Sequence, residues 1–175
     1  MRTRALAMAV VFAAFPHLAA AQDAPVSQAF RESATSAGKR LIAAAEEMPA
    51  DKYSFKPTPA QMSYGEIVAH LIEGNDYLCG LIGGEKAPAR KKVTGASGKE
   101  ALVGELKDTF AFCDQALAKV DDSKLSEQLP FFGGKTRSRA GIMFVTIGDW
   151  ADHYSQSAIY LRLNKLLPPT AKKES

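Results

Sequence analysis

Apolar residues recur every three or four positions in four stretches of the chain, which is the spacing of one face of an α-helix. Ser63 and Glu66 have the spacing of a capping box, in which each side chain satisfies a free backbone N–H at the start of a helix. Pro168-Pro169 should end the last helix, because proline cannot continue one. With no strand-rich region and no internal repeat, the pattern predicts an all-α fold. The predicted helices span residues 27–48, 63–80, 99–120 and 138–167.

One face of the fourth predicted helix is apolar at both ends and polar in the middle. Its polar part includes Asp149 and His153, and the second predicted helix carries His70 within its own apolar stripe. A buried acid or imidazole is unfavourable unless it is paired or bound to a metal. We therefore expect a metal site between these two helices. The residues of the face are Ile142, Val145, Asp149, His153, Gln156, Tyr160 and Leu163.

The connection between the second and third predicted helices, residues 82–98, is longer than the roughly two to eight residues that join antiparallel neighbours. A long connection lets the chain cross back, so that the two helices run parallel. Cys79 and Cys113 would then lie at similar depths along their helices. We predict a disulfide between them, and two buried thiols are the alternative.

The first residues have the composition of a secretory signal peptide. Two arginines precede a short apolar run, and Ala19-Ala20-Ala21 fits a cleavage site. We expect residues 1–21 to be removed and residues 22–175 to form one domain, secreted across the inner membrane into the periplasm. The alternative is an uncleaved anchor; no later stretch is long enough for a membrane span.

The charge of the chain argues against nucleic acid as a partner. The formal net charge is +3, and it falls to +1 without the leader, which carries two arginines and no acid. Nucleic-acid binding calls for a clustered excess of Lys and Arg, which this chain lacks. The expected partner is an unknown small molecule, and the oligomeric state stays open.

Short motifs on the second and fourth predicted helices resemble those of a known family. They are SYGEIVAHL at residues 63–71, HYSQS at residues 153–157 and YLR at residues 160–162, followed by Pro168-Pro169. With the helix order and loop lengths, these motifs resemble the DinB-like superfamily over nearly all of residues 22–175. The resemblance implies a four-helix bundle in up-down-down-up order, with a long crossover between helices 2 and 3.

The resemblance also implies a divalent metal held by three histidines, one from helix 2 and two from the last helix. His70 matches the first of these and His153 the last, whereas Asp149 stands where the family pattern has the middle histidine. Two histidines and one carboxylate suit Zn, Ni, Fe or Mn and leave positions open for water or substrate. Without a metal, Asp149 would accept a hydrogen bond from one of the histidines.

Three hypotheses for function follow. Members of the resembled family are described as metal-dependent hydrolases, so the first is a hydrolase with metal ligands His70, Asp149 and His153. Glu73, Gln156 and Tyr160 would support these ligands, and Glu73 is also an alternative ligand or a base. The second is a bundle that binds a small ligand or partner without metal or catalysis. The third is a structural domain in which the three ligand candidates satisfy one another.

Overall fold

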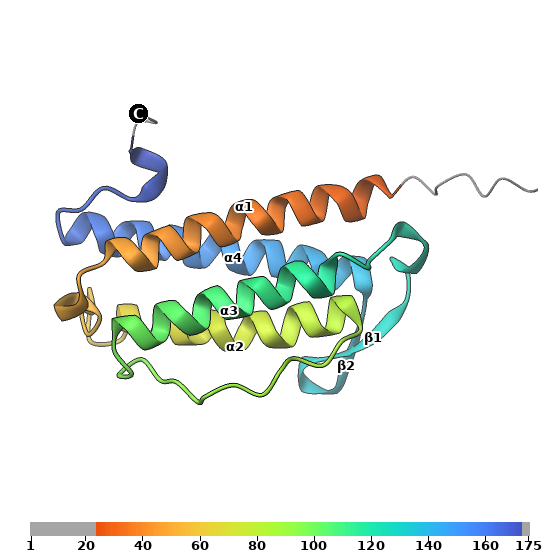
Figure 1. Cartoon of the computed structure of the whole chain (residues 1–175), viewed down its shortest axis with the longest axis horizontal. Helices are drawn as coiled ribbons and strands as arrows, with labels where there is room; N and C mark the ends of the chain where they lie inside the picture. Colours follow the sequence, from red (N-terminus) through yellow and green to blue (C-terminus); the bar gives the residue numbers. More distant parts are fainter. Residues whose placement is uncertain (1–23, 173–175) are drawn as a thin grey trace, which may run out of the picture.

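Four long helices make up most of the described chain, residues 24–172 of the computed structural model (Figure 1). The predicted all-α bundle is confirmed, and the predicted leader lies outside the described residues. Within residues 24–172, no helix is long and apolar enough to cross a membrane. The helices are α1 (Pro25–Glu47), α2 (Tyr64–Gly83), α3 (Lys99–Leu117) and α4 (Arg139–Leu163).

Helices α2 and α3 run parallel, as the long connection between them predicts. Asn75 donates a hydrogen bond to Thr109 at 3.1 Å, and a disulfide joins Cys79 to Cys113. Both contacts join residues 34 positions apart, and such a constant separation requires parallel helices. At the end of α2, a Cβ atom on Gly83 would lie 2.5 Å from the Ala116 carbonyl oxygen, so glycine allows this close approach.

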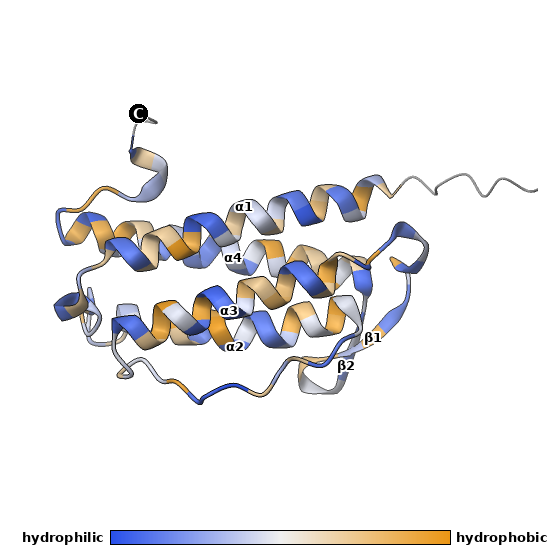
Figure 2. Ribbon diagram, viewed as in Figure 1, coloured by the Kyte–Doolittle hydropathy of each residue, from blue (hydrophilic) through white to orange (hydrophobic). Residues whose placement is uncertain are grey.

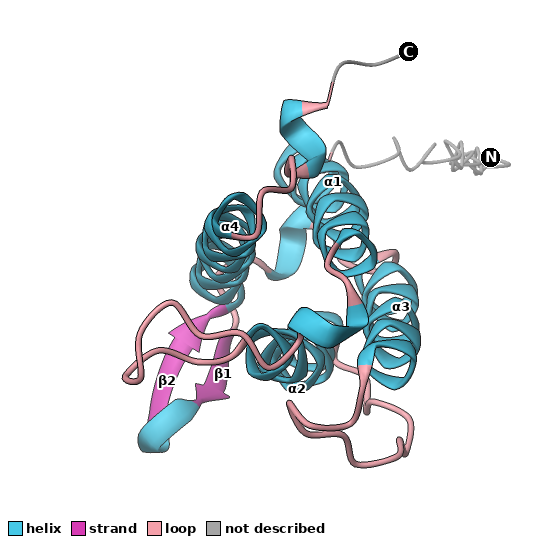
Figure 3. Ribbon diagram, turned by 90° about the vertical axis from the view of Figure 1, so that its left-hand side faces the viewer, coloured by secondary structure: helices cyan, strands magenta, loops and turns pink. Residues whose placement is uncertain are grey.

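Contacts of α4 complete the order of the bundle. The Trp150 ring stacks on Phe30, and Tyr154 lies under the Arg40 guanidinium, so α4 runs parallel to α1. Against α2 the order is reversed, because Trp150 hydrogen-bonds Asn75 while His153 stacks on His70. The helices are therefore arranged up-down-down-up, and the prediction is confirmed (Figure 3).

Apolar side chains from all four helices form one core. Figure 2 shows apolar and polar residues interleaved along each helix, as expected for helices that bury one face. Core residues such as Leu41, Leu71, Leu106 and Ile142 are at most 2% exposed. Burying each such side chain contributes roughly 1.5–3 kcal/mol, so the core is the main source of stability.

The helix ends differ from the prediction at several points. Helix α2 has the predicted capping box, with Ser63 accepting from the Glu66 N–H, but it continues to Gly83 because the left-handed turn is at Gly84 (φ 70°). Helix α4 ends at Leu163, before the proline pair, where the Asn164 side chain bonds the Tyr160 carbonyl oxygen. Apolar periodicity does not report where such turns and capping bonds end a helix, so the predicted ends are off by a few residues.

A β-hairpin lies between the third and fourth long helices, where the apolar spacing predicted no element. Strands β1 (Gln128–Phe131) and β2 (Lys135–Ser138) pair antiparallel, with Phe131 opposite Lys135. The turn between them contains Gly133 and Gly134 at φ values of 66° and 70°, which glycine adopts without strain. The sequence has no strand-rich region, and this short hairpin was not predicted. Both strands have four residues, too few for alternation to stand out.

Candidate metal centre

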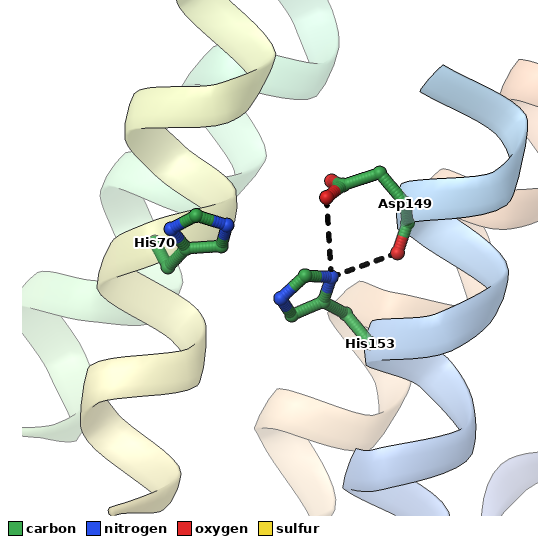
Figure 4. Close-up of side chains that lie close together, drawn as sticks. All are labelled: His70, Asp149 and His153. Carbon is green, nitrogen blue, oxygen red and sulfur yellow. Dashed lines mark hydrogen bonds and ion pairs between the residues drawn. The ribbon is translucent and has the colours of Figure 1, made fainter. Parts of the chain in front are cut away.

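Three of the predicted ligands meet on the facing sides of α2 and α4. His70 comes from α2, and Asp149 and His153 come from α4, where they lie one turn apart (Figure 4). One potential ligand atom from each residue lies within 4.8 Å of the others. The two imidazole ring centroids are 4.9 Å apart, with 29° between the ring planes. Residues nearly eighty positions apart in the sequence are thus brought together by the antiparallel pairing of α2 and α4.

The separation of the two rings fits a shared metal ion. Imidazoles bound at about 2.1 Å in neighbouring positions of one ion have ring centroids roughly 5 Å apart. Two nitrogens and a carboxylate oxygen are also a donor set that divalent transition metals prefer. The atoms that bind one metal ion lie roughly 3–3.5 Å apart. Side-chain rotations that move the ligand atoms by about an ångström would bring the present cluster to that spacing.

Hydrogen bonding fixes the orientation of the His153 ring. Its Nδ1 atom lies 2.8 Å from the Asp149 backbone oxygen and 3.5 Å from the Asp149 carboxylate. Because both oxygens only accept, Nδ1 is the nitrogen that donates, which leaves Nε2 as the nitrogen available to a metal. That second nitrogen points toward α2 and His70 (Figure 4). An imidazole held in this way resembles the oriented histidines of metal sites.

His70 is exposed, whereas the sequence placed it in an inward stripe. Ile67 and Leu71 are nearly fully buried, and His70 lies at the edge of their face, turned toward α4. The cluster therefore has a closed side at His153, which is buried, and an open side at His70. Such an arrangement leaves room for water or a substrate beside the ligands.

A buried polar network lies directly behind the cluster. The Trp150 indole N–H donates to Asn75 at 2.7 Å, and Asn75 in turn donates to Thr109 on α3. Trp150 and Asn75 follow Asp149 and Gly74 in the sequence, so this network sets how α2 and α4 align at the cluster. A Cβ atom on Gly74 would lie 3.9 Å from Asp149 Oδ2, which is ordinary van der Waals contact. The space between Gly74 and the Asp149 carboxylate is therefore free of other side chains. Nothing in the apolar spacing singled out Asn75, because its role depends on contacts with α3 and α4.

The other predicted site residues lie outside the three-residue cluster. Gln156 donates to Asp152 at 2.8 Å, and Tyr160 donates to the Met62 carbonyl oxygen at 2.7 Å. Burial raises the pKa of Tyr160, to which the Glu66 carboxylate adds, so its hydroxyl stays protonated as a donor. Glu73 is exposed, one turn from His70. Gln156 thus bonds within α4, whereas Tyr160 links α4 to Met62, just before α2.

Comparisons with known proteins agree with the fold. The family model of the DinB superfamily matches residues 34–157. A DinB-like protein from Bacillus cereus superposes with a TM-score of 0.70 at 15% identity, covering 81% of this chain and 95% of that one.

Two further solved structures share the fold. A DinB-like protein from Bacillus subtilis has a TM-score of 0.67 at 16% identity, over 83% of this chain and 99% of its own. A conserved protein from Enterococcus faecalis has a TM-score of 0.64 at 16% identity, over 79% and 96% of the two chains. Comparison with curated proteins gives no significant match.

Proposed function

The chain belongs to the DinB superfamily, and we propose that His70, Asp149 and His153 bind one divalent metal ion, Zn, Ni, Fe or Mn. The observation that carries this proposal is the convergence of two imidazoles and one carboxylate within 4.8 Å, from two helices. The oriented His153 ring and the exposed side of the cluster support it. Asp149 in place of a third histidine makes the set a two-histidine, one-carboxylate site.

The proposed activity is metal-dependent hydrolysis of a small molecule. A bound divalent metal polarises a carbonyl group and lowers the pKa of bound water. The protein would orient the ligands through the His153 hydrogen bond and the Asn75–Trp150 pair behind the cluster. Glu73, exposed one turn from His70, is the proposed base, since its carboxylate lies on the solvent side. Binding of a small ligand without turnover is the competing function.

Export to the periplasm is part of the proposal. The leader-like composition of residues 1–21 supports it, and so does the Cys79–Cys113 disulfide, because disulfides persist mainly outside the reducing cytosol. An exported protein would meet its substrate outside the cytoplasm, which favours hydrolysis over chemistry that needs a cytosolic thiol cofactor.

The proposal is tested by metal titration of the mature chain, purified without a histidine tag and stripped with a chelator. We expect about one equivalent of Zn, Ni, Fe(II) or Mn per chain, released again at low pH as the histidines protonate. His153→Ala should abolish this stoichiometric binding. Less than about a tenth of an equivalent for every metal would contradict the proposed centre.

Turnover is tested separately with the metal-loaded protein and a panel of ester, amide and phosphoester substrates. Hydrolysis that is lost in Glu73→Gln, with metal content unchanged, would support the assigned base. Metal binding without turnover of any substrate would favour the ligand-binding function.

A further inference from the structure

Three aromatic side chains form a cluster where α2 meets the hairpin. Tyr77 of α2 lies against Phe132 in the hairpin turn, with ring centroids 4.2 Å apart, and Phe131 lies 4.9 Å from Phe132. Arg137 is on β2, and its guanidinium lies 5.2 Å from the centroid of the Phe131 ring. Figure 3 shows the hairpin on the outer side of α2 and α4, away from α1 and α3.

The cluster lies on the same face of α2 as His70. Tyr77 follows His70 by seven residues, so the two side chains are nearly aligned and about 10 Å apart along the helix axis. Gly74 lies between them and carries no side chain that could obstruct the path past Asp149. His70, Gly74 and Tyr77 thus lie in a row along one face of α2, which we call the track.

The aromatic cluster presents one largely exposed ring to solvent. Phe132 is 56% exposed, and Phe131 and Tyr77 are only partly buried. Exposed aromatic rings are unfavourable in water, and a group of them commonly marks a binding surface. Leu129 and Phe131 of the hairpin pack against the core, whereas the Phe132 ring stays accessible to a ligand.

We propose that Tyr77, Phe131 and Phe132 bind an aromatic ring of the substrate, whose metal-binding oxygen group lies about 10 Å away at His70, Asp149 and His153. This inference rests on the proposed metal centre and names its substrate class: an aryl compound bearing a carbonyl or carboxylate group. The Arg137 charge disfavours a cationic ring substituent, and the exposed Glu73 beside the track disfavours an anionic linker.

The test measures hydroxamate binding to the metal-loaded protein by calorimetry. Acetohydroxamate reports on the metal alone, and a hydroxamate with a phenyl ring on a chain of about 10 Å reports on metal and ring together. We expect the phenyl compound to bind about tenfold tighter than an alkyl hydroxamate of equal length. Phe132→Ala and Phe132→Leu should remove this advantage and leave acetohydroxamate affinity unchanged.

The matched control is Phe144→Ala, because Phe144 is 74% exposed but lies in a hollow between α1 and α4. This variant should bind both compounds like the wild type. If acetohydroxamate binds and Phe132→Ala leaves phenyl hydroxamate affinity unchanged, the inference is overturned while the metal centre stands. If acetohydroxamate does not bind the metal-loaded protein, the metal has no position open to a ligand, and the inference fails while metal binding itself stands.

Discussion

Two aspartates of α4, three residues apart, have different surroundings and should differ in function. Asp149 faces α2, and its backbone and carboxylate oxygens both lie near His153 Nδ1. Asp152 is exposed and accepts a hydrogen bond from Gln156 on its own helix. Only Asp149 shares a cluster with two imidazoles, so only its charge should matter for a metal.

Neutralising each aspartate tests this difference. Asp149→Asn should weaken metal binding by at least about a hundredfold, because an amide is a poor substitute for a carboxylate ligand. Asp152→Asn should bind metal with wild-type affinity. Asp149→His, which supplies an imidazole at the same position, should keep the metal. Equal effects of the two asparagine substitutions, measured by competition with a metal-sensitive dye, would show that Asp149 is not a ligand.

The start of α2 is the clearest case of an element specified by its own residues. Ser63 and Glu66 exchange hydrogen bonds, and Lys56 pairs with Glu66 at 3.0 Å. The Ser63 backbone N–H, with Lys56 and the Ser63 hydroxyl, lowers the pKa of Glu66 from 4.5 to about 2. The ionised carboxylate therefore stabilises the folded state, and in it the start of the helix that carries His70.

Acid titration tests the capping box. Because the folded state lowers the pKa of Glu66, its contribution to stability is complete above about pH 4.5 and is lost as pH falls toward 2. Glu66→Gln should lower the thermal midpoint at neutral pH and reduce its change between these pH values. Glu73→Gln, at an exposed position of the same helix, is the control and should keep the wild-type pH dependence.

What the sequence could predict follows from how local each feature is. Helices, the capping box and the Asp149–His153 spacing depend on residues a few positions apart, and all three are present in the structure. The exposure of His70 depends on how α2 packs against α4, and the Asn75–Trp150 bond joins residues 75 positions apart. The hairpin depends on Tyr77 as a packing partner, which periodicity along the chain does not reveal.

At the scale of the molecule, the long crossover and the disulfide support one another. The crossover allows α2 and α3 to run parallel, and the parallel order places Cys79 beside Cys113. Both cysteines are at most 1% exposed, so the bond lies inside the core, on the opposite side of α2 from the exposed His70. The disulfide should therefore support the bundle without taking part in the site.

Removing the disulfide should lower stability by about 3–4 kcal/mol, because the unfolded chain gains the freedom of the closed loop. The comparison is urea unfolding of the oxidised protein against a Cys79→Ser, Cys113→Ser double variant. Metal affinity of the folded variant should be unchanged, since the metal ligands lie on α4 and on the side of α2 opposite the disulfide. Equal unfolding midpoints for the two proteins would show that the bridge does not constrain the chain.

X-ray absorption spectroscopy of the metal-loaded protein shows whether His70 and His153 share one metal ion. We predict nitrogen and oxygen ligands at roughly 2.0–2.2 Å, with the multiple scattering of two imidazole rings, and the loss of one ring in His70→Ala. A spectrum with only oxygen ligands and no imidazole scattering would contradict it, because His70 and His153 would then not share a metal ion.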